Sequence, residues 1–360
     1  MSFQKSERLP IIVWGTGYVG KMVLRDLVDH PLFELVGVIA NNPDKNGVDV
    51  GELIGGDPIG LAVSTDVDEV LARDAVAVAY FGPTAAHAGV NIKNTIKALR
   101  AGKHFVSTAM TSWVYPAACG PGEIDTVVKV CEETQKSCFT TGIDPGFAND
   151  LFPMTLMGLS GRVNSVRIQE ILDYATYSGD YAPMGFGELP EHKALLEHPE
   201  ILIYSWGRTI PMIADAIEVK LDKIDTVWEK WLAVEDIEYP FGVIKAGTVA
   251  AIRFEIRGWV DGEPRIIVEH CNRITNAAAP DWPRATSAEN DCYRVIIEGS
   301  PNITQETLFR DAFSGDANAG GCLSTGMRAV NAIPAVMAAT PGMLSPLDLP
   351  LIAGVGAMRS

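Results

Sequence analysis

The sequence has 360 residues, of which 47% are hydrophobic and 21% charged, a composition typical of a folded protein long enough for two domains. The formal net charge of -16 argues against a binder of nucleic acid or anionic membranes, because no basic segment offsets the repulsion from phosphates. The six cysteines lack CxxC spacing, which favours free thiols in a reducing cytoplasm over disulfides or a bound metal. No signal peptide is recognisable, and prolines interrupt the apolar stretch 342–358, so we expect a cytoplasmic protein without a membrane span.

An apolar run at residues 11–14 leads into a glycine-rich turn and then into a helix-like stretch at 21–27. The order strand, GxGxxG, helix is the fingerprint of a dinucleotide-binding unit. Gly15 would make the tight turn, Gly17 would let the backbone approach a pyrophosphate, and Gly20 would let the helix pack on the strand. The alternative is a glycine-rich structural turn. We expect the whole loop to contact the cofactor: Gly15, Thr16, Gly17, Tyr18, Val19 and Gly20.

A second apolar strand is predicted over residues 33–40, and the chain turns directly after it. In a dinucleotide fold the end of this strand meets the adenosine ribose, where an acidic side chain would bind a 2′-hydroxyl and repel a 2′-phosphate. Asn41 and Asn42 stand here instead of an acid, with Lys45 close by. We therefore expect these three residues to contact the cofactor and to favour NADP(H), with NAD(H) as the alternative.

The alternation of strands and helices continues to about residue 141. Strands are predicted over 61–64, 75–81, 104–108 and 138–141, with helices near 66–71 and over 87–101 and 122–135. Such apolar strands fit a parallel sheet covered on both faces, so this part is predicted to form a doubly wound Rossmann sheet. Ligands bind at the carboxyl ends of such strands. The further candidates for cofactor contact are therefore Gly82, Pro83, Thr84, Thr108 and Ala109.

The pattern changes after a connecting helix predicted over 148–159. A strand at 163–174, a hairpin that pairs 251–257 with 265–271, and a strand at 292–298 indicate a largely antiparallel sheet. A helical, aromatic-rich insert is expected over 190–231, and a terminal helix over 323–336. The predicted fold class is thus α/β with a second α+β domain. We expect residues 1–150 to bind the dinucleotide, 151–322 to form a substrate and dimerisation domain, and 323–360 to return to the first domain.

Three segments carry a resemblance to a known family: Val48–Leu53, Gly142–Asp150 and Met327–Val336. Together with the glycine-rich loop, they make the chain resemble the 2,4-diaminopentanoate dehydrogenase family. That group contains the native amine dehydrogenases, and its N-terminal domain is similar to that of dihydrodipicolinate reductase. The resemblance implies an NAD(P)H-dependent homodimer that interconverts an amine with a ketone or aldehyde plus ammonia, in a pocket between the domains.

The resemblance also bears on individual residues. Phe147 matches a ProGlyPhe element of the family and would lie against the substrate. The family usually carries a glutamate just after the strand that ends here at Thr108, where the glutamate binds and activates ammonia or the amine. Met110 stands in its place and becomes a candidate for substrate contact. Asp144 stands where the family more often has asparagine, so we expect the acid to have moved.

Reductive amination needs proton transfers beside the substrate nitrogen, because a carbinolamine must lose water before an iminium ion accepts hydride. Asp144 is our first catalytic candidate; the alternative is a turn residue before a proline. Tyr174 is a candidate hydroxyl donor and Tyr177 a candidate substrate contact, with domain packing as the alternative for both. His270 and Glu170 are further candidates for an acid, although a half-buried structural role is the plainer interpretation of the histidine.

The leading functional hypothesis is an enzyme that aminates a small, apolar ketone or aldehyde with ammonia, or catalyses the reverse oxidative deamination. A dicarboxylate substrate would require clustered arginine or lysine in the second domain, and the sequence has no such cluster. One alternative is a reductase of a carbonyl, an imine or an activated C=C bond that does not use ammonia. The other is a non-catalytic sensor that binds a nucleotide.

Overall fold

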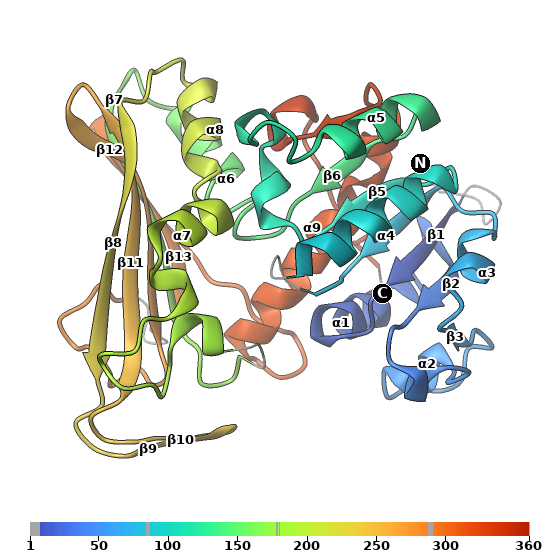
Figure 1. The fold of residues 1–360 in the computed structure, drawn as a ribbon, viewed down its shortest axis with the longest axis horizontal. Coiled ribbons are helices and arrows are strands. Elements are labelled where there is room, and N and C mark those ends of the chain that lie inside the picture. Colours follow the sequence, from blue (N-terminus) through green and yellow to red (C-terminus); the bar gives the residue numbers. More distant parts are fainter. Residues whose placement is uncertain (1–7, 84–86, 178, 180, 287–290, 360) are drawn as a thin grey trace. The chain divides into compact units, whose positions relative to one another are not determined.

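The computed structural model describes residues 8–83, 87–177, 179, 181–286 and 291–359. The chain forms two compact units (Figure 1). Unit 1 extends to Ile143 and resumes at Cys322, whereas unit 2 spans Asp144–Gly321. Within the described residues, no helix is both long enough and apolar enough to cross a membrane.

Unit 1 contains a parallel sheet of seven strands in the order β15-β6-β5-β4-β1-β2-β3. Six of them have the strand order of a Rossmann fold, which confirms the predicted fold class. The seventh, β15, was not predicted; it has only two residues and lies in the stretch 342–358 that prolines interrupt. The strands are β1 Leu9–Trp14, β2 Phe33–Ile39, β3 Val63–Ser64, β4 Ala77–Tyr80, β5 His104–Ser107, β6 Cys138–Thr140 and β15 Met343–Leu344.

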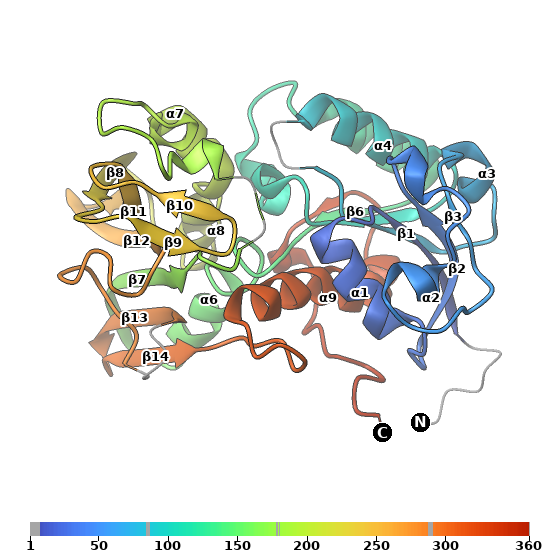
Figure 2. The same cartoon turned by 90° about the horizontal axis from the view of Figure 1, so that it is seen from below.

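Helices cover both faces of this sheet (Figure 2). Alternate residues of β1 enter two separate cores: Ile11 and Val13 pack with α1 and α9, whereas Ile12 and Trp14 pack with α3, α4 and α5. Helix α9 comes so close to α1 that a Cβ atom at Gly326 would lie 2.2 Å from Val23 Cγ2. The helices are α1 Tyr18–Leu27, α2 Val50–Leu53, α3 Val67–Leu71, α4 Ala88–Arg100, α5 Asp125–Thr134 and α9 Ala317–Ala338.

Unit 2 is built on a sheet of six strands in the order β14-β13-β7-β12-β11-β8. All neighbouring pairs are antiparallel except β7 and β12, so the prediction of a largely antiparallel sheet is confirmed. The strands are β7 Arg162–Asp173, β8 Lys223–Leu232, β11 Val249–Val260, β12 Glu263–Arg273, β13 Cys292–Ser300 and β14 Ile303–Thr307, beside a small hairpin of β9 Ile237–Tyr239 and β10 Gly242–Ile244. The helices are α6 Leu151–Met157, α7 Pro199–Trp206 and α8 Thr209–Ala216.

One element of unit 2 was predicted wrongly. The insert expected to be helical over 190–231 contains α7 and α8, but its last part is strand β8. This segment is rich in β-branched and aromatic residues and pairs with β11 along nearly its whole length. Pairing with a neighbouring strand decides the conformation of such a segment, and the neighbour is not visible in the local pattern.

The two faces of the unit 2 sheet differ in chemistry. Helices α7 and α8 cover one face, where Trp206 packs against Phe254, and a Cβ atom at Gly258 would lie 2.5 Å from Ile210 Cγ2. The opposite face carries a charged network centred on Glu269, which accepts hydrogen bonds from Arg167 at 2.5 Å and Arg253 at 2.6 Å. Because side chains alternate along β12, its next residue, His270, faces the helices.

Two buried histidines of unit 1 are expected to make the fold sensitive to acid. Burial, and for His30 also the charge of Arg359, lowers the pKa of His30 and of His104 from 6.5 to about 4. Nδ1 of each ring accepts a backbone N–H at 3.2 Å, from Leu32 and Ser137 respectively. The neutral rings therefore stabilise the fold above pH 6.5. That contribution, at most about 3 kcal/mol for each ring, is lost as the pH falls towards 4.

Replacing either histidine by asparagine keeps an acceptor but removes the titration. Urea denaturation of His30→Asn and His104→Asn should give a free energy of unfolding that falls less between about pH 7 and pH 4 than in the unsubstituted protein. The exposed His192→Asn serves as the control and should follow the unsubstituted curve. An equal acid sensitivity in all four proteins would contradict the prediction.

Candidate active site

In the glycine-rich loop between β1 and α1, the fold requires glycine at two positions but not at a third. Gly15 has a φ of +117°, and a Cβ atom there would lie 2.3 Å from the carbonyl oxygen of Phe81. At Gly20 a Cβ atom would lie 1.9 Å from the oxygen of Gly15. At the exposed Gly17, by contrast, a Cβ atom would meet nothing within 4 Å. The absence of a side chain here leaves space at the start of α1, where the backbone amides suit a phosphate.

Lys45 links the end of β2 to this loop. Its Nζ donates to the backbone oxygen of Thr16 at 2.7 Å and to Thr16 Oγ1 at 3.1 Å. Burial and the charge of Lys21 lower the pKa of Lys45, so the two lysines repel each other unless an anion lies nearby. Asn41 and Asn42 are exposed, and the Asn42 side chain caps the turn that carries Lys45. The residues of this corner fit the phosphates of a dinucleotide.

The remaining cofactor candidates follow β4 and β5. Gly82 lies against the ring of Tyr80, from which a Cβ atom would be only 2.2 Å away. Pro83 and Thr108 are half-buried, and the N–H of Ala109 donates to Ser107 Oγ at 3.0 Å. Thr84 lies outside the described residues. Gly82, Pro83, Thr108 and Ala109 thus lie at the carboxyl ends of neighbouring parallel strands.

Met110 lies in the core of unit 1. Its side chain is 1% exposed and packs in the cluster that contains Tyr80 and Trp113. Its Sδ accepts from the side-chain amide of Asn91 at 3.5 Å. A side chain enclosed in this way presents no surface to a substrate within unit 1, so the geometry gives no support to the predicted substrate contact.

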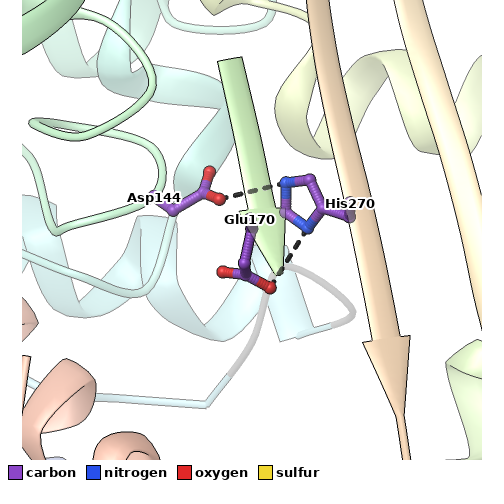
Figure 3. A group of neighbouring side chains, drawn as sticks. All are labelled: Asp144, Glu170 and His270. Carbon is purple, nitrogen blue, oxygen red and sulfur yellow. Dashed lines mark ion pairs between the residues drawn. The ribbon is translucent and has the colours of Figure 1, made fainter. Parts of the chain in front are cut away.

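Three ionisable side chains meet in unit 2 (Figure 3). Asp144 precedes Pro145 in the loop after β6, and Glu170 and His270 are register partners on the parallel strands β7 and β12. Oδ2 of Asp144 lies 3.0 Å from Nε2 of His270, and Oε1 of Glu170 lies 3.3 Å from Nδ1 of the same ring. None of the three side chains is more than 5% exposed. We call these three residues the carboxylate–imidazole cluster.

The neighbours of the cluster fix its charges. Burial opposes ionisation of Glu170, but the attraction of His270 and hydrogen bonds from Tyr174 and Asn272 lower the pKa of Glu170 to about 2. Burial also opposes protonation of His270, but the two carboxylates raise the pKa of His270 to about 10. The pKa of Asp144 is raised by burial, against the pull of His270. The surroundings therefore favour the ionised form of Glu170 and the protonated form of His270, and burial increases the proton affinity of Asp144.

The arrangement favours an ion triad over a metal site. The ligand atoms lie within 4.8 Å of one another, but the two carboxylates face different nitrogens of the imidazole ring. A single metal ion would need the carboxylates and one ring nitrogen to converge on one point.

Several buried acceptors around the cluster have unused capacity. Among the described residues, Oδ1 of Asn149 and Oδ1 of Asn272 have no hydrogen-bond donor, and Oδ2 of Asp144 has only the ion pair with Nε2 of His270. Asn149 orients the aspartate, because its amide donates to Oδ1 of Asp144. Buried acceptors without donors are costly unless a ligand completes them. An ammonium or iminium group is such a donor.

The structure also places the aromatic candidates. Phe147 is half-buried and stacks on Phe152, with ring centroids 5.6 Å apart. The hydroxyl of Tyr174 donates to Oε1 of Glu170 at 2.7 Å, and burial raises the pKa of Tyr174 well above its usual value. Tyr177 is half-buried and packs on Tyr174 at 5.0 Å. Tyr174 is thus joined to the cluster through Glu170.

Sequence reasoning named Asp144, Glu170 and His270 only as separate candidates and missed the supporting residues Asn149 and Asn272. The available signal was a charged or polar side chain within the otherwise apolar face of each strand. Glu170 interrupts the face formed by Ile168 and Leu172, and His270 and Asn272 follow Val268 on their face.

Comparison with known proteins finds two family profiles along this chain. The dihydrodipicolinate reductase N-terminus profile matches residues 9–111, and the 2,4-diaminopentanoate dehydrogenase C-terminal domain profile matches residues 147–360, more than half of the chain. The chain belongs to the 2,4-diaminopentanoate dehydrogenase family. This confirms the predicted resemblance.

Two relatives of this family match along nearly their whole length. An amine dehydrogenase of Streptomyces virginiae is 36% identical over 351 residues, which are 96% of this chain and 97% of the relative. A 2,4-diaminopentanoate dehydrogenase of Acetoanaerobium sticklandii is 26% identical over 352 residues, 96% and 94% of the two chains. These matches confirm an NAD(P)-dependent oxidoreductase of the amine dehydrogenase type.

Solved structures confirm the fold. The amine dehydrogenase from Mycobacterium smegmatis has a TM-score of 0.77 at 21% identity and covers 96% of this chain and 97% of its own. GenD2 from gentamicin A biosynthesis, in complex with NAD, has a TM-score of 0.50 at 14% identity and covers 92% of this chain and 88% of its own. Biliverdin reductase from Synechocystis, in complex with biliverdin and NADP+, has a TM-score of 0.50 at 11% identity and covers 97% of this chain and 94% of its own. A nicotinamide cofactor accords with this fold.

Proposed function

We propose that this member of the 2,4-diaminopentanoate dehydrogenase family catalyses the reductive amination of a ketone or aldehyde: carbonyl compound, ammonia, NADPH and a proton give amine, NADP+ and water. The observation that carries the proposal is Asp144, a buried carboxylate whose Oδ2 has, among the described residues, only the His270 ring as a partner, with Nε2 3.0 Å away. An ammonia-derived nitrogen supplies a further donor to this carboxylate, and its iminium form supplies the positive charge that a buried carboxylate attracts.

In this proposal Asp144 acts as the acid and base at the substrate nitrogen. A pKa raised by burial brings a carboxyl group towards the working pH, where it both gives and takes a proton. When bound, the nicotinamide supplies the hydride. Asn149 orients the aspartate, and Tyr174 supports it indirectly through Glu170. Phe147 and Tyr177 are proposed to contact an apolar substrate through their half-buried rings.

The test is NADPH oxidation with a panel of ketones and aldehydes, with and without ammonia. The expected result is turnover that requires ammonia and is fastest with small, apolar carbonyl compounds. Equal rates without ammonia would instead favour a reductase of carbonyls, imines or activated C=C bonds. No turnover with any carbonyl compound, together with tight NADPH binding, would favour a sensor.

For the cofactor we propose a preference for NADP(H) over NAD(H). Lys45 and Lys21 place two positive charges beside the glycine-rich loop, and Asn41 and Asn42 put no carboxylate at the end of β2. A 2′-phosphate would relieve the repulsion between the lysines.

Lys45→Ala should lower kcat/KM for NADPH by about 10-fold or more and change that for NADH by less than about 3-fold, because a hydrogen bond to a charged group contributes roughly 1.5–3 kcal/mol. The matched control is Lys93→Ala, which removes an exposed charge from α4 of the same unit and should leave both values unchanged. A wild-type preference for NADH, or equal losses with both cofactors, would contradict the proposal.

We further propose that unit 1 binds the cofactor, that unit 2 binds the substrate, and that the protein is a homodimer. The sheet face around Glu269 supports the last point, because Arg167 and Arg253, which pair with this buried carboxylate, stay partly exposed and can contact a second copy. Light scattering in solution should give the mass of two chains. The mass of one chain at micromolar concentration would rule the dimer out.

A further inference from the structure

The positions of the two carboxylates around His270 define the protonation of the ring. Asp144 lies at Nε2 and Glu170 at Nδ1 (Figure 3). A neutral imidazole carries one N–H and one lone pair, so one of its nitrogens would direct a lone pair at a carboxylate. Only the imidazolium offers an N–H to both sides.

Glu170 is fixed in place behind the ring. Its Oε1 accepts from the hydroxyl of Tyr174 at 2.7 Å and from the amide of Asn272 at 2.9 Å. Both donors stabilise the ionised carboxylate and leave it no freedom to turn away from His270. The glutamate is thus held as an anion before any substrate binds.

The ring itself is held by aromatic side chains. Phe254 of β11 stacks on it at 4.4 Å, and Trp206 of α7 meets it edge-on at 5.4 Å. Trp228 of β8 stacks on the far side of Phe254 at 5.6 Å. These neighbours are uncharged, and the charged groups that raise the pKa of His270 are Asp144 and Glu170.

We propose that His270 is a positioning residue that stays an imidazolium throughout turnover, held by Glu170, and that its charge keeps Asp144 ionised to receive the substrate nitrogen. The catalytic role of Asp144 in this inference rests on the proposed function. Two carboxylates and one imidazolium leave the cluster with a single negative charge. A bound ammonium or iminium ion neutralises it, whereas a neutral carbonyl compound does not. The cluster would thus favour the cationic state of the substrate over the neutral one.

The first experiment reads the charge of the ring directly. Histidine side chains labelled with ¹⁵N should show His270 still doubly protonated at about pH 9, while His30 and His104 titrate at the acidic end, where burial lowers their pKa to about 4. Glu170→Gln should lower the midpoint of His270 by roughly one pH unit or more. Asp144→Asn, which removes the other carboxylate, should lower it as well and serves if Glu170→Gln does not fold.

The second experiment measures how the charge of His270 affects the ionisation of Asp144. His270→Asn removes the positive charge beside the aspartate, so the acidic limb of the pH profile of kcat/KM should move up by roughly one pH unit or more, with the Kd for NADPH unchanged. A merely structural histidine would lower the amount of folded enzyme without moving this limb.

The proposal and the proposed function fail separately. Titration of His270 near pH 6.5 in the unsubstituted protein would contradict the assignment of His270 as an imidazolium. An unchanged midpoint of His270 in both carboxylate variants would contradict it as well. Stoichiometric Zn²⁺ binding that displaces the His270 proton would replace it with a metal site. If the imidazolium persists but no carbonyl compound is aminated, the charge assignment stands and the amination reaction falls.

Discussion

Replacing Asp144 by asparagine should lower kcat for reductive amination by about 100-fold or more while leaving the Kd for NADPH unchanged. The substitution keeps the size of the side chain and can still accept the bond from Asn149, but it removes the group that gives and takes a proton. The loss of a general acid and base typically costs this much or more. The measurement is steady-state turnover with ammonia, together with fluorescence titration of NADPH.

Asp150→Asn is the matched control for this prediction. Asp150 is a buried carboxylate of the same loop that accepts from the backbone N–H of Gly146 at 2.7 Å and of Leu151 at 2.5 Å. Its loss should lower the melting temperature but leave the rate per folded molecule within about 5-fold, because structural hydrogen bonds contribute to stability and not to proton transfer. Near-normal turnover in Asp144→Asn would remove Asp144 from the mechanism.

Alanine at Gly15 and at Gly17 should separate folding from cofactor binding. Gly15→Ala forces a side chain into a left-handed backbone conformation and against the carbonyl of Phe81, so we expect a loss of at least about 2 kcal/mol in the free energy of unfolding and no measurable NADPH binding. Gly17→Ala meets no protein atom within 4 Å and has an ordinary φ of -74°. It should fold normally and raise the Kd for NADPH by about 10-fold or more, because a methyl group would occupy the approach of the pyrophosphate.

The two variants are measured by urea denaturation and by NADPH titration on the same preparations. Each serves as the control for the other, since both add one methyl group to the same loop. Unchanged NADPH affinity in Gly17→Ala would mean that the pyrophosphate does not approach this residue. Normal stability in Gly15→Ala would mean that the turn can open without cost.

The sequence predicted the parts of the fold that have a strong local signal. The apolar strands of unit 1 and the hairpin of β11 and β12 follow directly from their periodicity. Strand β8 did not, because its partner β11 lies beyond two short strands and only that partner makes the segment extended. The other strands that were not predicted, β9, β10, β14 and β15, have five residues or fewer.

The candidate site was predictable in its residue types but not in its assembly. Glu170 and His270 are 100 residues apart in the chain and meet only because β7 and β12 pair in parallel in this register. A shift of one residue would turn either side chain to the opposite face of the sheet. Met110 illustrates the converse, because the strand end was predicted but the direction of the side chain, into the core with Asn91, was not.

Unit 1 is completed by residues that follow unit 2 in the chain. Ala329, Val330 and Ile333 of α9 fill the core beneath β1, and β15 adds the outer strand beside β6. The sheet therefore cannot close its core while the ribosome is still making unit 2, and the cofactor loop must wait for a segment more than three hundred residues downstream. Removal of α9 and β15 is therefore expected to prevent unit 1 from folding, although the glycine-rich loop itself would remain intact in the sequence. The nucleotide site of unit 1 can therefore form only in chains that have been synthesised through α9 and β15.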